Sequence, residues 1–204
     1  MRKLFFFILF ALLFSVNAVA QGVQMRNLFA SMPDSLLPMM TKNNRLDCID
    51  FIENDMEAKV RNRLDDYVEL KTLTQDYLLL QTSEQSRVEM KYVAKGDTTG
   101  IVYLVRTYYG PAGDSSIECY DQDWRVVKNA VVRPEVEAFF KTASGTDADT
   151  LQQIVRELKD LTLLEASLSA DRATLTWKIA LDELSVGDKK VAKQYVQEVV
   201  TALP

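Results

Sequence analysis

The sequence predicts an α+β protein in which N-terminal, middle and C-terminal helices accompany a predominantly antiparallel sheet of about seven or eight strands. Short apolar or alternating segments recur about every ten residues between Val68 and Val127, which is typical of short strands. The connections between them are too short for parallel crossovers, so we expect an antiparallel meander. Segments with apolar residues three or four positions apart precede and follow this region and predict helices.

The first 20 residues have the pattern of a secretory signal peptide. Arg2 and Lys3 precede an unbroken apolar run from Leu4 to Phe14, and Ala18-Val19-Ala20 has the small-x-small pattern of a signal-peptidase site. The apolar run is shorter than the ~20 residues that a membrane-spanning helix needs. We therefore expect cleavage before Gln21 and an exported protein, located in the periplasm, at the cell surface or outside the cell.

Residues 21–204 are expected to form a single acidic domain without a transmembrane segment. Without Arg2 and Lys3, the chain has 22 basic and 29 acidic side chains, so its net charge is −7. An acidic chain without a run of Lys or Arg lacks the positive field that attracts nucleic acids, so we expect no nucleic-acid partner. Residues 144–149 are interpreted as a hinge within this domain.

Two helices are expected before the sheet. Residues 21–28 are interpreted as a lead-in, after which Ser31 fits a helix N-cap and Pro38 ends this first piece. A second helix is predicted near 44–61, because its apolar residues fall in one stripe. The stripe consists of Leu46, Ile49, Ile52, Met56, Val60 and Leu64. The residues of this helix expected in solvent are Arg45, Asp50, Glu57 and Arg61.

Five or six strands are expected in the middle of the chain, separated by segments rich in turn-forming residues. They are Val68–Leu70, Tyr77–Gln81, Val88–Tyr92, Ile101–Tyr109, Ile117–Tyr120 and, less regular, Trp124–Val127. Asp121-Gln-Asp123 offers two carboxylates at alternate positions, as calcium loops do, but lacks the further ligands of such a loop. We interpret it as a turn in which aspartate side chains bond the nearby backbone.

Helices and strands alternate in the last third of the chain. Pro134 opens a helical stretch, and Asp147 or Asp149 caps a helix near 149–160. The stripe of that helix is Leu151, Ile154, Val155 and Leu158. Strands are expected near 161–169 and 174–179, and a last helix from Ser185 with Val191, Tyr195, Val199 and Leu203 on one side. A helix followed by two strands thus occurs twice, which leaves open a faint duplication of a helix-plus-hairpin unit.

Four segments of the chain resemble those of a known family. They are Ser31–Pro38, Asn43–Phe51, Leu73–Gln81 and Tyr120–Trp124. Together with the signal peptide, they resemble an uncharacterised family of exported Bacteroidales proteins, a domain of unknown function. The half after Pro134 matches only in outline. The resemblance implies an exported α+β protein and gives no activity, substrate or catalytic residue.

The residue types exclude several kinds of enzyme. Because the sequence has no histidine, it cannot form a Ser-His-Asp triad, a Cys-His pair or a His-ligated metal site. Its glycines form neither a phosphate-binding loop nor a nucleophile elbow. We therefore expect no catalytic residue, cofactor or metal. A carboxylate-dependent glycan hydrolase stays an alternative, although acids such as Glu89 and Glu118 fall on the solvent side of the pattern.

The function that these observations favour is non-catalytic binding or interaction in the bacterial envelope, with an envelope protein or glycan as partner. A carrier of a lipid or other apolar ligand is a further alternative. The candidate binding residues are Arg106, Tyr108 and Trp124, since aromatic residues gather in adjacent predicted strands and Arg106 is the single charge between Ile101 and Tyr109. Arg106 would otherwise pair with an acid of a neighbouring strand, such as Glu118 or Glu89.

Cys48 and Cys119 raise the question of a disulfide, because the chain is expected to be exported. Closing the loop between them would contribute roughly 4 kcal/mol in the chain-entropy model. Cys48 borders the apolar stripe of its helix, however, and Cys119 alternates with polar residues in its strand. Both therefore also fit small core residues, and the pairing stays open.

Overall fold

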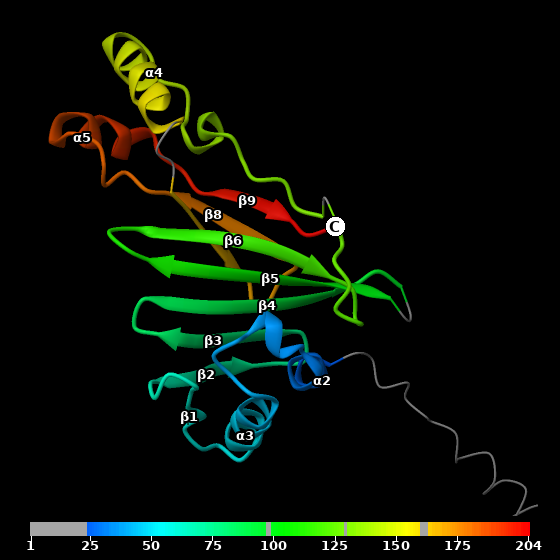
Figure 1. Ribbon diagram of the computed structural model, residues 1–204. Coiled ribbons are helices and arrows are strands. Elements are labelled where there is room, and N and C mark those ends of the chain that lie inside the picture. Colours follow the sequence, from blue (N-terminus) through cyan, green and yellow to red (C-terminus); the bar gives the residue numbers. More distant parts are fainter. Residues whose placement is uncertain (1–23, 97–98, 129, 160–162) are drawn as a thin grey trace, which may run out of the picture.

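The computed structural model describes residues 24–96, 99–128, 130–159 and 163–204, so the expected signal peptide lies outside the described residues. Nine described strands form a six-stranded sheet of order β1-β2-β3-β4-β5-β6 and a three-stranded sheet of order β7-β8-β9. Figure 1 shows α2 and α3 beside the first strands of the large sheet and α4 and α5 beyond the small sheet. The α+β class and the antiparallel meander are confirmed, with the strands divided between two sheets.

The large sheet is a meander of consecutive hairpins. Its strands are β1 (Lys59–Arg61), β2 (Tyr67–Leu73), β3 (Tyr77–Ser83), β4 (Ser86–Ala94), β5 (Gly100–Tyr109) and β6 (Gly113–Tyr120). The expected strand Trp124–Val127 forms only an isolated bridge between Val126 and Tyr120. The reason is local, because Trp124 has a φ of 63° and leaves the extended conformation.

A helix forms where we expected a lead-in. α2 (Met25–Ser31) buries Met25, Leu28 and Phe29, while Ser31 is its last residue and donates its hydroxyl to the carbonyl of Leu28 at 3.2 Å. The sequence suggested that Ser31 is a helix N-cap, but it ends α2 and does not cap a following helix. The short 3₁₀ turn η1 (Asp34–Leu36) then leads into α3.

α3 (Lys42–Glu53) is shorter than the predicted helix near 44–61. Thr41 begins it, since its Oγ1 accepts the N–H of Asn44 at 3.1 Å in a capping box. The helix ends because Asp55 adopts a φ of 55°, and the chain turns into β1. Met56 is consequently 49% exposed, and Val60 is buried from a strand instead of a helix.

The buried face of α3 includes a charged residue that we expected in solvent. Arg45 is 1% exposed and donates to the carbonyls of Phe29 at 3.1 Å and Met32 at 2.5 Å, and to Asp34 Oδ1 at 2.9 Å. The guanidinium of Arg45 thus donates to carbonyls at the C-terminal end of α2. The inward face is rotated relative to the predicted stripe, so Leu46 is 41% exposed.

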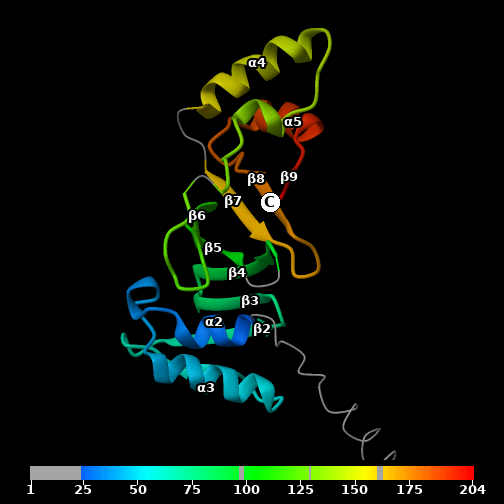
Figure 2. The same cartoon turned by 90° about the vertical axis from the view of Figure 1, so that its right-hand side faces the viewer.

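Both faces of the large sheet are covered. Alternate residues of β5 point to opposite sides: Val102 and Leu104 join the core under α2 and α3, whereas Tyr103 and Val105 join the core under the small sheet. β7 packs against β4, β5 and β6. Figure 2 shows α2 and α3 at one end of the molecule, α4 and α5 at the other, and β7 between them.

The remaining elements are η2 (Val136–Phe139), α4 (Thr146–Lys159), β7 (Leu164–Leu168), β8 (Thr174–Ile179), α5 (Val186–Tyr195) and β9 (Val199–Ala202). Of the predicted stripe of α4, Leu151, Ile154 and Leu158 are buried and Val155 is half-buried. The helix begins earlier than expected, so Asp147 and Asp149 lie in its first turn and do not cap it. Ser185 caps α5 by accepting the N–H of Asp188 at 3.2 Å.

We expected Val199 and Leu203 to lie on the last helix, but α5 ends at Tyr195 and neither residue belongs to it. The following residues pair with the chain after η2: Val196 bridges Phe140, and Gln197 donates its N–H to the carbonyl of Phe139 at 2.8 Å. This pairing directs the chain into β9. The two helix-plus-strand units noted in the sequence belong to different sheets.

Candidate functional site

Side chains of the large sheet bind the outer edge of β7. The N–H groups of alternate β7 residues point away from β8, and such edge groups need partners when they are covered. Three side-chain oxygens accept them: Asp114 Oδ1 from Leu164 at 3.1 Å, Ser115 Oγ from Ala166 at 2.8 Å, and Glu89 Oε2 from Leu168 at 2.8 Å. Polar contacts therefore fix the small sheet on the large one.

Two carboxylates flank Arg87 at this junction. Arg87 Nε lies 3.0 Å from Glu89 Oε1, and its Nη2 lies 3.1 Å from Glu165 Oε1. Tyr77 donates to Glu89 Oε2 at 3.2 Å, and Tyr109 donates to Glu165 Oε1 at 2.8 Å. Glu89 is 2% exposed. Our expectation that it lies in solvent was wrong, because the small sheet covers this face of β4.

This pair is the arrangement in the described chain that comes nearest to our hydrolase alternative. Burial raises the pKa of Glu89, an effect that the charge of Arg87 partly opposes, and a general acid needs such a shift. Both oxygens of Glu89, however, face protein groups: Arg87 on one side, and Tyr77 and the N–H of Leu168 on the other. The geometry supports a structural role at the sheet junction.

A groove of about 480 Å³ follows the outer edge of β6, the last strand of the large sheet. Residues 114–120, part of the segment 126–133, and Trp177 of β8 line it. We call it the β6 groove. Val126, which lines it, is 67% exposed, and Val132 of the same segment is 78% exposed. The groove therefore has an apolar border that is open to solvent.

Two main-chain positions on the edge of β6 stay open. Val127 donates its N–H to the outward carbonyl of Cys119 at 2.8 Å. Because main-chain groups alternate in direction along an antiparallel strand, those of Ile117 and Ser115 point the same way. Within the described chain, no hydrogen bond reaches the main chain of either residue from this side. Ile117 and Ser115 thus offer N–H and C=O groups to the groove.

Trp177 adds a buried donor to the same groove. Its side chain is 2% exposed, and its Nε1 has no hydrogen-bond acceptor among the residues that the structure describes. A buried N–H without a partner costs about 1–3 kcal/mol. A group of this kind that lines a groove points to an acceptor supplied from outside the described chain.

The charged residues that line the β6 groove are already engaged. Glu118 forms an ion pair with Arg106, and Asp114 accepts the N–H of Leu164 and lies 3.8 Å from Arg133. The groove therefore presents main-chain groups and apolar side chains. It suits a ligand with polar groups along its backbone, and binding does not require a charged group on that ligand.

The three binding candidates from the sequence lie in different environments. Arg106 forms an ion pair with Glu118, one of the partners we expected, and donates to the carbonyl of Leu36 at 2.9 Å, so it ties η1 to β5. Tyr108 is 61% exposed at the end of β5. The ring of Trp124 lies at a tilt against that of Tyr120, with ring centroids 5.7 Å apart, and its indole N–H donates to Ser31 Oγ at 3.3 Å.

The cysteines lie in separate cores. Cys48 belongs to the core beneath α2 and α3, and Cys119 to the core on the opposite face of the large sheet. Both are free thiols. Burial raises the pKa of Cys48 to about 12 and that of Cys119 to about 11. Both side chains are therefore protonated at neutral pH and act as small core residues.

The Asp121 motif forms the turn that the sequence predicted. Asp121 Oδ1 accepts the N–H groups of Asp123 at 2.9 Å and Arg125 at 2.8 Å. Within the described ranges, no group of three or more acidic or Cys side chains is arranged to hold a metal ion. In the same part of the chain, no helix is both long and apolar enough to cross a bilayer.

Sequence reasoning missed the residues that make up the β6 groove. Trp177 alternates with Thr176 and Lys178 in the sequence, and this pattern indicates only an inward-facing aromatic residue. Ser115 and Ile117 take part through their main chain, which leaves no trace in residue type. The one available signal was the glycine- and proline-containing turn before β6 together with the Asp121 turn after it, which delimit a short strand.

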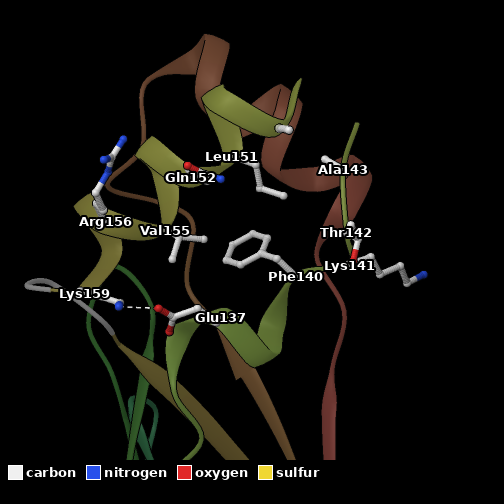
Figure 3. Close-up of a pocket in the computed structure, with 11 residues that line it drawn as sticks. Glu137, Phe140, Lys141, Thr142, Ala143, Leu151, Gln152, Val155, Arg156 and Lys159 are labelled. Atoms are coloured by element: carbon white, nitrogen blue, oxygen red, sulfur yellow. Dashed lines mark ion pairs between the residues drawn. The ribbon is translucent and has the colours of Figure 1, made fainter. Parts of the chain in front are cut away.

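A second cleft, of about 400 Å³, lies between α4 and the chain that follows η2 (Figure 3). We call it the α4 cleft. Phe140 points from one wall toward Leu151 and Val155 of α4, and Lys159 forms an ion pair with Glu137 at its lower border. Its lining shares no residue with that of the β6 groove.

Comparisons with known proteins give a family and a fold. A family model described as a protein of unknown function, DUF3256, matches residues 15–202. The solved structure of a domain of an uncharacterized protein from Porphyromonas gingivalis W83 is similar, with a TM-score of 0.71 and 20% sequence identity over 89% of this chain and 94% of that chain. At this identity, the similarity shows the fold alone. No curated protein matches the chain.

Proposed function

Since the chain belongs to a family of unknown function, DUF3256, we propose a function from its own geometry: it is a non-catalytic binding protein of the bacterial envelope that holds an extended polypeptide segment in the β6 groove. One observation carries this proposal. The open main-chain positions of Ile117 and Ser115 share a groove with the unpartnered indole N–H of Trp177.

The binding mode is the addition of a strand to a sheet edge. An extended peptide pairs its main chain with the edge, which provides affinity, while alternate side chains contact the groove walls. Here the peptide would hydrogen-bond to Ser115 and Ile117, and one of its carbonyls would accept the N–H of Trp177. Val127 already uses the edge this way at Cys119, so the bound peptide would continue that pairing.

A polypeptide partner fits the groove better than the glycan that we also considered. Glycan recognition relies on exposed aromatic faces and charged or amide groups. Trp124 does not line the groove, and the aromatic residues that do, Tyr120 and Trp177, are buried. The envelope location rests on the signal-peptide pattern of residues 1–20, and it makes an exported protein the expected source of the peptide.

The test is an NMR titration of the mature protein with a five-residue peptide of alternating threonine and valine, acetylated and amidated at its ends. We expect saturable shifts of the amides of Ser115 and Ile117 and of the Trp177 indole. Trp177→Phe removes the donor but keeps a ring and should weaken binding about fivefold. Ile117→Pro removes an outward N–H and should weaken it similarly, since proline is tolerated at such edge positions.

Ile117→Ala is the matched control, because it shortens the same side chain but keeps the main-chain N–H. A second control is the peptide methylated on its alternate amide nitrogens, which cannot pair with a strand edge. If the proline and alanine variants bind equally well, or if the methylated peptide binds as tightly as the unmodified one, strand addition at β6 is wrong. Peptide shifts confined to other surfaces would also overturn it.

A further inference from the structure

We propose that the α4 cleft is a second binding site, which takes a single aliphatic chain ending in a carboxylate. The argument does not depend on the β6 groove, because the two linings have no residue in common. It rests on three features of the cleft: walls that are fixed before a ligand arrives, an apolar floor, and an excess of positive charge at the mouth.

Both walls of the α4 cleft are held by contacts outside it. On one side, Lys141 donates its N–H to the carbonyl of Tyr195 at 2.9 Å, next to the bridge between Phe140 and Val196. On the other side, α4 is anchored by Ile154, which is fully buried. Tyr195 also donates its hydroxyl to Asp147 Oδ2 at 2.8 Å, which joins α5 to the first turn of α4. A preformed cleft avoids the cost of ordering its walls on binding.

The floor of the cleft is apolar. Figure 3 shows the ring of Phe140 in the centre, with Leu151 and Val155 directed toward it from α4. Phe140 and Val155 are only half-buried, so they keep apolar surface that a ligand can cover. The volume of about 400 Å³ lies near the lower end of the range for ligand sites. It suits one aliphatic chain better than a lipid with two.

The charge at the mouth is positive although the whole chain is acidic, with a net charge of −5. The lining contains Lys141, Arg156 and Lys159 but a single acid, Glu137. Glu137 is paired with Lys159, whereas Lys141 and Arg156 form no ion pair within the described chain. Both are exposed, and in Figure 3 their side chains extend away from Phe140 on opposite sides of the cleft.

An apolar floor beside two unpaired cations selects a ligand with an apolar body and an anionic end. The flexible side chains of Arg156 and Lys141 can turn toward a group at the mouth, and a guanidinium binds a carboxylate through two parallel hydrogen bonds. The positive mouth disfavours a cationic amphiphile of the same length. A neutral alcohol would keep the floor contacts but lose the charged ones.

Decanoate is the probe, used below the concentration at which it forms micelles and titrated into the mature protein with ¹³C-labelled methyl groups. We expect saturable shifts of the Leu151 and Val155 methyls, and affinity about tenfold weaker for 1-decanol. The double variant Lys141→Glu, Arg156→Glu should weaken decanoate binding about tenfold or more and leave decanol unchanged. Ala148→Phe, which fills the cleft from α4, should abolish binding of both.

The matched control is the double variant Arg172→Glu, Lys190→Glu, which makes the same charge change at exposed positions outside the cleft. It should bind decanoate like the unmodified protein. Equal affinities for decanoate and decanol, equal losses in the two double variants, or methyl shifts that do not saturate would each overturn the proposal. None of these outcomes bears on peptide binding at the β6 groove, which is monitored at Ser115, Ile117 and Trp177.

Discussion

Arg45 and Glu89 are charged residues that the sequence pattern places in solvent and that the structure buries. In sequence, both fall on the polar phase of an amphipathic pattern. In the structure, Arg45 donates to two carbonyls at the C-terminal end of α2, and Glu89 accepts the N–H of Leu168 and faces Arg87. Buried charges occur where hydrogen-bond partners surround them. Apart from Arg87, which lies two residues from Glu89 on β4, those partners belong to other elements of the chain, so no local pattern could reveal them.

The buried Glu89 carboxylate predicts a pH dependence of stability. Burial raises its folded-state pKa above the ordinary value of 4.5, so between these two values the folded state holds the proton more tightly than the unfolded state. The contribution of Glu89 to stability is then fully present below pH 4.5 and is lost as the pH rises through the folded-state pKa. Measured by urea unfolding, the advantage of the wild-type protein over Glu89→Gln should be larger near pH 4.5 than at neutral pH.

Glu84→Gln is the control for this prediction. Glu84 is exposed in the turn between β3 and β4, so its substitution should leave the pH dependence of unfolding as it is in the wild-type protein. If Glu89→Gln and Glu84→Gln give parallel stability curves over this pH range, the buried carboxylate does not contribute in the stated direction.

At the scale of elements, β7 is an edge strand whose free N–H groups are bound by side chains instead of another strand. Ser115 is the central acceptor: its Oγ takes the N–H of Ala166 at 2.8 Å and lies 2.8 Å from Thr107 Oγ1. Ser115→Ala leaves that N–H buried without an acceptor. We expect the free energy of unfolding to fall by about 1–3 kcal/mol, together with faster hydrogen exchange at the Ala166 amide.

Ser116→Ala, at the next position of the same strand, is the control, because its side chain is exposed. It should change the stability by less than about 0.5 kcal/mol. Equal effects of the two substitutions would mean that the Ser115 hydroxyl does not support the β7 edge.

Elements set by nearby residues could be predicted from the sequence, whereas elements set by contacts between distant segments could not. The stripe of α4 and the cap of α5 depend on residues within one or two turns, and both are found as expected. β9 was missed because Val199 and Leu203 also fit a continued helix. What ends α5 is the pairing of Val196 with Phe140, a contact between segments more than fifty residues apart.

At the scale of the whole molecule, the sequence predicts removal of residues 1–20 on export. The charged start, the short apolar run and the Ala18-Val19-Ala20 site lead us to expect a mature protein that begins at Gln21. N-terminal sequencing and intact mass of exported material should give this start. Replacing Ala18 and Ala20 with larger residues should block processing, and material that keeps residues 1–20 in the inner membrane would contradict the prediction.

The sequence by itself determined the α+β class, the antiparallel meander, the α4 stripe and the Asp121 turn, because periodicity and turn chemistry act over a few residues. Only the tertiary structure decided that the strands divide into two sheets, that the second face of β4 is covered, and that the edge of β6 stays open beside Trp177. These features depend on which distant segment packs on a strand. The β6 groove brings Trp177 beside residues 114–133, and one wall of the α4 cleft is held by the pairing of Phe140 and Lys141 with Val196 and Tyr195, so neither site could be predicted from local patterns.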